Sequence, residues 1–328
     1  MTERGQERGW LRTVVHRHRA LAPVAVLILL CIVVAFFNAR FVDPWNLVRL
    51  LNAAAIPIVL TMGATFIILM GSIDLSLEGV LAVCAVLVSV LVGNNLTPLN
   101  VGFVAVPAAI LLGAALGGLN GVAHVRLRTP SFMTMLGVGF ACVGAATAFL
   151  QGDTVRISDK VFRGMALERF FGVPAGVWIA GLAVLVALFI QERTRVGRWL
   201  YALGGDEATA RQAGVPIEHT RIVAFMIAGG FYGLAGAMSA AQLGQGHALI
   251  GQGRLFMTIT AVVVGGTALS GGVGSVLNSV IGVLIVVVLS NGMILMGVPP
   301  FVQMGVQGVL IIVAVALALD RSRLAIVK

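Results

Sequence analysis

The chain contains apolar runs, free of charged residues, that are nearly long enough to cross a lipid bilayer. Two of them are LAPVAVLILLCIVVAFF at 21–37 and VPAAILLGAALGGLNGVA at 106–123. A membrane-spanning helix needs about 20 mostly apolar residues. Across the whole sequence, 59% of residues are hydrophobic and 11% are charged, whereas a soluble domain has roughly 25% charged residues. The runs therefore predict an all-α, polytopic membrane protein.

Hydropathy predicts about ten transmembrane helices. The predicted spans are 21–37, 50–70, 77–93, 101–123, 131–150, 175–191, 219–242, 256–270, 274–295 and 301–319. The first span is too long for a usual signal-peptide core and has no convincing A-x-A site after it, so we expect it to be retained. The expected layout is a basic segment at 1–20, a transmembrane domain at 21–320 and a tail at 321–328.

The distribution of Lys and Arg predicts the orientation of these spans. With the N-terminus inside, 15 of the basic residues fall on the inner side and seven on the outer side. This excess is the bias that membrane proteins show toward the cytoplasm, so we expect both termini to be cytoplasmic. The net charge of +9 is then explained by loops at the ends of spans, without a nucleic-acid partner.

Two segments of the chain resemble one another. LNGVAHVRLRTPSFMTMLGVG (119–139) and SNGMILMGVPPFVQMGVQG (290–308) both carry Asn-Gly followed by Pro-x-Phe. The first Pro falls in a predicted inner loop and the second in an outer loop, which predicts an inverted internal repeat. In transport proteins with such repeats the pathway lies at the repeat interface. The candidate pathway residues are Asn120, Phe132, Thr134, Asn291, Phe301 and Gln303.

The stretch GSIDLSLEGV (71–80) places two carboxylates between apolar runs. Gly71 and Ser72 are predicted to end the second span, and Asp74 or Ser76 to cap the N-terminus of the third. Glu78 would then lie in the first helical turn, where the helix dipole favours a negative charge. If the break lies on a cytoplasmic rim, Glu78 is a solvated acid, and if the break is re-entrant, Glu78 faces the pathway.

The segment GGDEATARQAGVP (204–216), inside the predicted cytoplasmic loop 191–219, predicts a short helix. Asp206 is the expected N-cap, Glu207 lies in the first turn, Gly214 is the expected residue after the C-cap, and Pro216 prevents continuation. A short amphipathic helix with small side chains suits docking into a groove on a partner. The same composition also fits an ordinary connecting helix.

The glycine-rich segment VVVGGTALSGGVGSV (262–276) lacks the Gly-Lys-Ser/Thr ending of a phosphate-binding loop. A tight turn and close helix packing explain its glycines better. These are Gly265, Gly266, Gly271, Gly272 and Gly274. The sequence shows no Ser/His/Asp set, HExxH motif or paired cysteines, so we expect neither an enzyme nor a metal site.

Four segments in order resemble the permease subunits of ribose-type monosaccharide ABC transporters of the bacterial inner membrane. They are GSIDLSLEGV, RTRVGRWLYALGGDEATARQAGV, VVVGGTALSGGVGSV and LSNGMILMGVPPFVQMGVQGVLIIVAVALALD, and the resemblance runs from about 45 to 321. It implies a second permease subunit in a homo- or heterodimer, cytoplasmic subunits that bind ATP and Mg²⁺, and a periplasmic or extracellular substrate-binding protein. The transport subunit itself would import a monosaccharide or small polyol by alternating access.

By the same resemblance, the short cytoplasmic helix is the coupling helix that docks on the ATPase. It maps onto Gly205, Asp206, Glu207, Ala210, Arg211 and Gly214. Such permeases usually have a small or aliphatic residue where Glu78 stands, and an acidic pair near the position of Arg254. These departures leave open related solutes: a furanosyl autoinducer, a nucleoside or a branched-chain amino acid. An ion-coupled secondary transporter would need ionisable groups inside the membrane, and Asp74 and Glu78 alone qualify.

Overall fold

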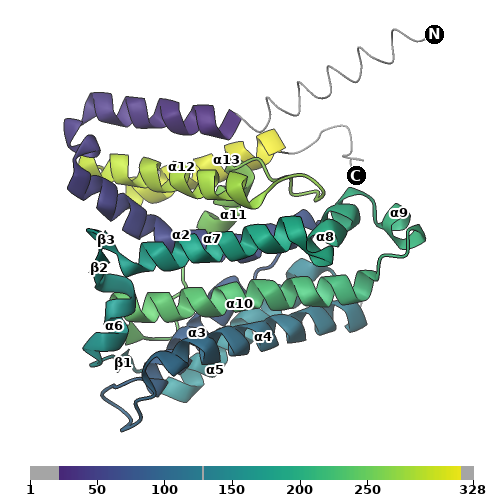
Figure 1. Cartoon of the computed structure of the whole chain (residues 1–328), viewed down its shortest axis with the longest axis horizontal. Helices are drawn as coiled ribbons and strands as arrows, with labels where there is room; N and C mark the ends of the chain where they lie inside the picture. The colour runs from purple at the N-terminus through teal and green to yellow at the C-terminus, as the bar shows by residue number, and fades with distance from the viewer. Residues whose placement is uncertain (1–21, 128, 319–328) are drawn as a thin grey trace.

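The computed structural model describes residues 22–127 and 129–318, which form an elongated bundle of helices (Figure 1). The helices are Ala22–Phe37, α2 (Pro44–Leu69), α3 (Leu77–Leu91), α4 (Ala105–Leu127), α5 (Ser131–Leu150), α6 (Lys160–Leu167), α7 (Ala175–Arg193), α8 (Arg195–Gly205), α9 (Glu207–Gln212), α10 (Ile217–Leu243), α11 (Arg254–Val264), α12 (Val276–Leu295) and α13 (Pro300–Ala318), with short 3-10 helices η1 (Ala39–Val42) and η2 (Gly102–Val104). Among the described residues, six helices are long and apolar enough to cross a membrane. The all-α, polytopic prediction is therefore confirmed.

In the part of the chain that the structure describes, four two-residue strands form two small antiparallel pairs. They are β1 (Val155–Arg156), β2 (Arg169–Phe170), β3 (Val173–Pro174) and β4 (Gln245–Gly246). Strand β1 pairs with β4, and β2 pairs with β3. The pairs lie at the end of the bundle opposite α9 (Figure 1).

The centre of the bundle is the antiparallel pair α2 and α10. Their most apolar windows are 78% and 67% buried, whereas that of α5 is only 28% buried. Gly63 of α2 packs against Ala228 and Tyr232 of α10, and Phe66 lies 6.3 Å from Phe231 between ring centroids. Because Gly63 has no side chain, the two helices approach closely at this point.

The remaining helices pack on this pair in a repeated pattern. Helix α4 packs along α10 and α12 packs along α2, while α3 contacts α5 and α11 contacts α13. The α4–α5 turn lies at the α9 end, because Gly121 contacts Ile222 near the start of α10. The α12–α13 turn lies at the strand end, because Asn291 bonds Asn46 near the start of α2. The two copies of the repeat thus have opposite directions, as the sequence predicts.

Glycines form the seam between α4 and α10. A side chain at Gly113, Gly117 or Gly121 would collide with the backbone of α10, and one at Gly229 or Gly233 would collide with α4. These glycines recur every four residues and therefore share one helix face. The two helices therefore pack backbone against backbone along this face.

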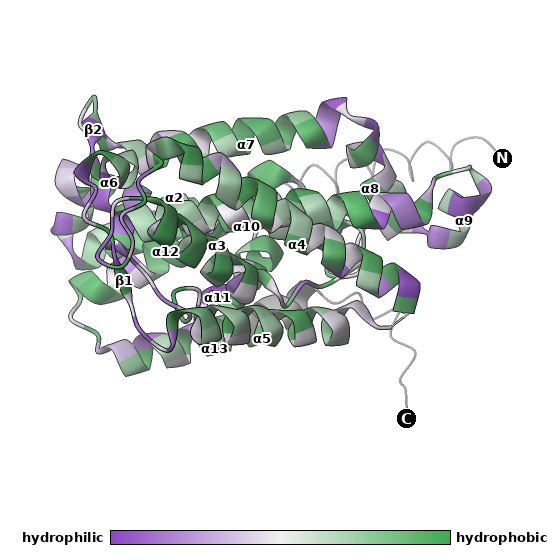
Figure 2. Ribbon diagram, turned by 90° about the horizontal axis from the view of Figure 1, so that it is seen from below, coloured by the Kyte–Doolittle hydropathy of each residue, from purple (hydrophilic) through white to green (hydrophobic). Residues whose placement is uncertain are grey.

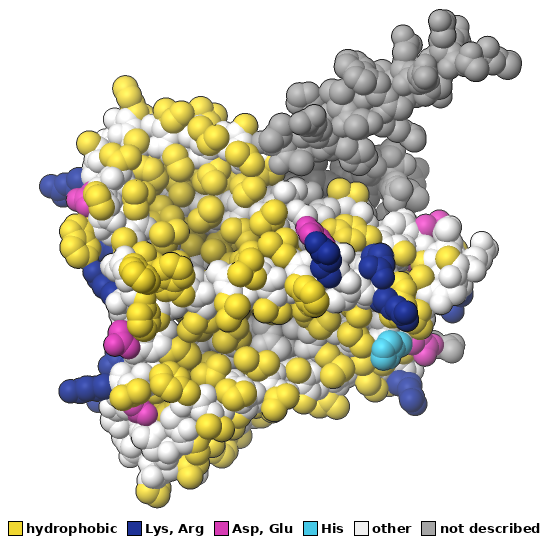
Figure 3. All heavy atoms as spheres, viewed as in Figure 1, with side chains coloured by type: hydrophobic (Ala, Val, Ile, Leu, Met, Phe, Trp, Pro, Cys, Tyr) yellow, Lys and Arg dark blue, Asp and Glu magenta, His cyan; other side chains and the backbone are white. Residues whose placement is uncertain are grey.

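The surface has an apolar middle and two hydrophilic ends. Polar residues gather around α9 at one end and around the strands and α6 at the other (Figure 2). On the face shown in Figure 3, hydrophobic side chains cover the middle, and charged side chains lie toward the two ends. This distribution suits a protein whose middle is surrounded by lipid chains.

Several predicted boundaries are wrong for reasons visible in the structure. The predicted span 256–270 is the shorter helix α11, because the chain turns at Gly265 and Gly266. The segment between the predicted spans 131–150 and 175–191 contains α6, whose N-terminus is capped by Asp159 and which buries Phe162. The predicted segments 1–20 and 321–328 lie outside the described residues.

Candidate functional site

Helix α9 has the local structure that its sequence predicts. Asp206 is the N-cap, and its Oδ1 accepts a hydrogen bond from the Thr209 amide at 3.0 Å. The Gly214 backbone has φ +79°, and the next amide, that of Val215, donates to the Ala210 carbonyl. This is the usual way in which a glycine ends a helix.

Glu207 ties α9 to α10. Its carboxylate pairs with Arg211 at 3.2 Å within α9 and with Arg221 of α10 at 2.6 Å. Ala210 is buried, whereas Arg211 and Gly214 are exposed at the end of the bundle. Helix α9 thus presents an exposed polar surface while its inner face is held against the bundle.

Helix α8, which the sequence did not predict separately, connects α9 to the membrane-spanning part. A side chain at Gly204 would collide with the Leu69 carbonyl and the Gly272 amide, and these two groups bond each other at 2.9 Å. The Tyr201 hydroxyl donates to the Gly274 carbonyl at 2.7 Å. Burial raises the pKa of Tyr201, and nearby Glu192 raises it further, so the phenol stays protonated.

The glycine-rich loop before α12 is the surface on which α8 rests. Backbone φ angles are positive at Gly266, Gly271, Gly272 and Gly274, a conformation that favours glycine. A side chain at Gly271 would collide with both Gly71 and Gly204. The end of α8, the end of α2 and this loop therefore meet backbone to backbone, which confirms the tight turn and close packing expected from the sequence.

A buried polar network occupies the break between α2 and α3. Asp74 is only 7% exposed, and its Oδ1 accepts hydrogen bonds from the Ser76 amide at 2.8 Å and the Ser76 hydroxyl at 2.6 Å. Asn120 of α4 donates to the same Ser76 hydroxyl at 2.7 Å. Seven residues follow Asn120 in α4, so the network lies about 10 Å from the end of this helix.

The capping prediction for this break is half right. Ser76 is the N-cap residue, but its hydroxyl makes no capping bond, because its backbone is helical (φ −83°, ψ −9°) and the hydroxyl is bound by Asp74 and Asn120. The Asp74 carboxylate instead accepts the Ser76 amide directly. The carboxyl group of Asp74 therefore lies at the start of α3, as predicted.

Two further buried polar atoms belong to this region. The Tyr232 hydroxyl of α10 lies close to the Asp74 carboxyl group. The Asn120 Oδ1 finds no hydrogen-bond partner in the described part of the chain. Buried polar atoms of this kind destabilise a fold by about 1–3 kcal/mol unless something binds them. The Asn120 Oδ1 can accept a hydrogen bond from a hydroxyl group of a small polar molecule.

Glu78 lies in the first turn of α3, as predicted, but its carboxylate binds the start of another helix. Its Oε1 accepts the Leu255 amide at 2.9 Å, so it caps the N-terminus of α11 and not that of α3. Residues 244–253 bring α11 to it: Gly246 packs against Ser89 near the end of α3, and Gly251 packs against Glu78 at its start. The chain thus re-enters the bundle along α3 before α11 begins.

Arg254 opens α11 beside the same carboxylate. Its guanidinium lies in the electrostatic field of Glu78. The two departures from the family pattern, Glu78 and Arg254, therefore meet in space. The acidic side chain at the N-terminus of α11 is therefore supplied by α3.

The six candidate pathway residues do not form one site. Asn120 joins the Asp74 network, whereas Asn291 pairs with Asn46 at the opposite end of α2. Thr134 bonds Thr129 at the α9 end, and Gln303 bonds the Val298 carbonyl at the strand end. Phe132 and Phe301 are exposed on α5 and α13. The repeat separates the two sets because it is inverted.

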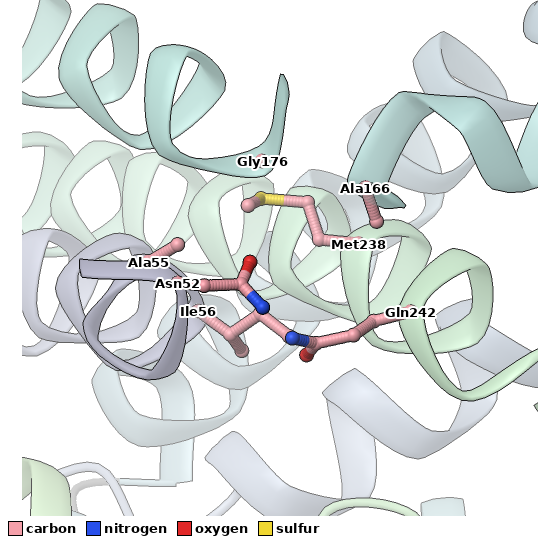
Figure 4. A pocket seen from close by; sticks show the side chains of 7 residues that line it. All are labelled: Asn52, Ala55, Ile56, Ala166, Gly176, Met238 and Gln242. Carbon is pink, nitrogen blue, oxygen red and sulfur yellow. The ribbon is translucent and has the colours of Figure 1, made fainter. Parts of the chain in front are cut away.

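A small cavity lies near the strand end between α2, α6, α7 and α10 (Figure 4). The Asn52 and Gln242 side chains point toward one another there, beside Met238. The space available to the centre of a water-sized sphere is ≈ 10 Å³, which suits one water molecule and not a sugar. We therefore do not assign substrate binding to this cavity.

Comparison with known proteins places the chain in a family. The family model described as "Branched-chain amino acid transport system / permease component" matches residues 46–315. The chain belongs to this permease family. The matched range contains the α2–α3 break, α8, α9 and the glycine-rich loop.

Individual relatives of the permease cover nearly its whole length. The ribose import permease RbsC of Escherichia coli K12 is 34% identical over 89% of this chain and 91% of its own. The D-allose transport system permease AlsC of the same strain is 31% identical over 88% and 89% of the two chains. The L-arabinose transport system permease AraH is 31% identical over 90% and 88%. No solved structure matches the chain.

Sequence reasoning missed several residues that organise the permease. No local sequence pattern marks the buried Tyr232 or the hydrogen bond from Tyr201 to the Gly274 carbonyl. The same is true of Gln191 of α7, whose side chain accepts a hydrogen bond from the Val276 amide at 2.7 Å. The one available signal was the polarity of Tyr232 and Gln191 in apolar surroundings.

Proposed function

We propose that this permease is the membrane subunit of an ABC importer for a monosaccharide. Relatives that cover almost its whole length carry the names of ribose, allose and arabinose transport proteins, and this supports a sugar as the substrate class. The observation that carries the mechanism is the direct packing of α8 between α9 and the α2–α3 break. An external force on α9 would therefore reach the buried polar network.

In this proposal a separate cytoplasmic ATPase subunit docks on α9 and carries ATP and Mg²⁺. The docking residues are Gly205, Asp206, Glu207, Ala210, Arg211 and Gly214. The exposed side of α9 and its small residues suit a groove on such a partner. Closure of the ATPase would move α8 and bias the break between two arrangements, which is how alternating access works.

Two further partners belong to the proposal, because the chain is a member of a transport permease family. A second permease subunit would complete the pathway, and a periplasmic or extracellular binding protein would deliver substrate to the strand end. We place the protein in the bacterial inner membrane with α9 and both termini in the cytoplasm, as the Lys and Arg distribution favours. The buried Asn120 Oδ1, which lacks a partner among the described residues, supports a pathway for a hydroxyl-rich solute.

The substrate class is tested by uptake in a strain deleted for the gene. Labelled ribose, arabinose, allose, a nucleoside and a branched-chain amino acid are compared with and without the gene on a plasmid. We expect gene-dependent uptake of one or more of the sugars. Uptake of only the nucleoside or the amino acid would contradict the sugar assignment and leave the permease family intact.

The docking role of α9 is tested with Glu207→Ala and Arg211→Ala. We expect both variants to insert into the membrane normally and to lose sugar uptake and substrate-stimulated ATP hydrolysis. Arg193→Ala, an exposed arginine at the end of α7, is the matched control and should keep both activities. Normal uptake in both α9 variants would remove the docking role.

A further inference from the structure

The β2–β3 hairpin presents a phenylalanine in a conformation that does not suit it. Phe170 pairs with Val173, so Phe171 and Gly172 form a two-residue turn. Both have positive φ angles, 53° and 80°, the geometry that Asn-Gly adopts most readily. A bulky residue at the first of these positions is strained.

The Phe171 side chain gains nothing from burial inside the described chain. It is 98% exposed, and Phe170 beside it is also exposed. A strained turn that displays an apolar ring indicates an apolar surrounding outside the chain.

Two exposed tryptophans, each in a candidate membrane span, lie beside the hairpin. The Phe171 ring lies edge-on to Trp178 in the first turns of α7, with centroids 6.4 Å apart. The Arg169 guanidinium lies 5.0 Å from the ring centroid of Trp45 at the start of α2. Both helices are candidate membrane spans, and Trp178 and Trp45 are 54% and 63% exposed.

The exposed face of α7 continues this patch along the bundle. Leu182, Leu185 and Phe189 follow Trp178 as exposed apolar residues. The hairpin is fixed to α7, because the Ala175 amide donates to the Glu168 carbonyl at 2.7 Å. Its aromatic tip therefore lies at the strand end of this exposed apolar face.

We propose that the β2–β3 hairpin is an interfacial anchor that seats Phe170 and Phe171 in the boundary between lipid headgroups and acyl chains. Arg169 extends from the same hairpin and can reach a lipid phosphate while its stem covers Trp45. Aromatic and arginine side chains together suit this boundary, which is apolar on one side and wet on the other. The anchor does not depend on which solute the permease carries.

The test places a fluorescent reporter at the hairpin. In full-length protein with Trp10, Trp45, Trp178 and Trp199 replaced by Phe, Phe171→Trp gives a single tryptophan. The protein is reconstituted in vesicles of phosphatidylethanolamine and phosphatidylglycerol. We expect strong quenching by lipids brominated near the headgroup, weaker quenching by lipids brominated near the chain end, and little by aqueous acrylamide. Full acrylamide access without bromolipid quenching would overturn the anchor.

A second variant separates anchoring from folding. Phe171→Asn creates Asn-Gly, which favours the same turn, so the melting temperature should not fall. In a protein with Trp178 as its only tryptophan, we expect Phe171→Asn to increase acrylamide quenching and shift emission to the red. Phe171→Leu, which keeps an apolar side chain, should leave both near the wild-type value. Unchanged Trp178 fluorescence in Phe171→Asn would contradict the proposal.

Discussion

The break between α2 and α3 and the re-entrant stretch between α10 and α11 occupy equivalent places in the repeat but satisfy their helix starts differently. Residues 70–76 carry their own acid, and Asp74 binds the amide that opens α3. Residues 244–253 carry no acid, and α11 takes Glu78 from α3. A helix that starts inside an apolar bundle needs an acceptor for its free amides. The comparison shows that either the segment itself or a neighbouring helix can supply it.

The two solutions also connect the halves of the repeat to different degrees. The Asp74 network joins α3 to α4 and reaches toward α10 through Tyr232. The Glu78 bond joins the start of α3 to the start of α11. Both helix starts are therefore held at one depth of the bundle, close to where α8 contacts the end of α2.

Removing Asp74 should have the largest effect. Asp74→Leu leaves the Ser76 amide and hydroxyl without their acceptor in a buried site, which we expect to destabilise the protein by about 3 kcal/mol. Uptake should be abolished, while Asp74→Asn, which keeps one oxygen acceptor, should retain part of it. Thermal unfolding in detergent and sugar uptake measure the two effects. Near-normal uptake by Asp74→Leu would show that the break does not depend on its own acid.

Glu78→Leu should have the next largest effect. We expect a loss of about 2 kcal/mol, because the α11 amide loses its acceptor and Arg254 its neighbouring charge. Uptake should fall, and adding Arg254→Glu should restore much of it, because an acid in the first turn of α11 then caps its own helix. If the double variant is no better than Glu78→Leu, the carboxylate acts through something other than the α11 N-terminus.

Gly251→Ala tests how closely the re-entrant stretch must approach α3. The added Cβ would lie 2.5 Å from the Glu78 carbonyl oxygen, so we expect a loss of about 1 kcal/mol through displaced backbone. Gly137→Ala on α5 is the control, since nothing lies within 4 Å of a Cβ there. Equal melting temperatures for the two variants would argue against a close α3–α11 junction.

Glu207→Ala should change stability least, although it should stop coupling. Its ion pairs with Arg211 and Arg221 lie at the hydrophilic end, where such pairs contribute only about 0.5 kcal/mol. We expect a melting temperature close to wild type, in contrast to Glu78→Leu. A large destabilisation would mean that α9 is a structural part of the bundle.

The parts of the fold that follow from local chemistry could be predicted from the sequence. Asp206 and Gly214 delimit α9 as expected, and the glycines before α12 form the expected tight turn. Asp74 lies at the start of α3, because the Gly71–Ser72 turn and the following apolar run leave few alternatives.

The parts that depend on distant contacts could not be predicted. Glu78 binds a backbone amide 177 residues away, and such a bond requires no particular side chain on α11. Helix α8 was absorbed into a polar loop, because only Thr194, whose hydroxyl accepts the Gly197 amide, separates it from α7. The candidate pathway residues were chosen from the repeat, and the inverted repeat places them at opposite ends of the bundle.

The most direct test of the account is transport in proteoliposomes that contain this permease, an ATPase subunit and a sugar-binding protein encoded near its gene. Labelled sugar accumulation and ATP hydrolysis are measured together for the wild type and for Arg211→Ala. We predict accumulation that requires ATP, hydrolysis stimulated by the loaded binding protein, and loss of both in Arg211→Ala. Sugar accumulation driven by a proton gradient without ATP, equal in the two proteins, would contradict the account.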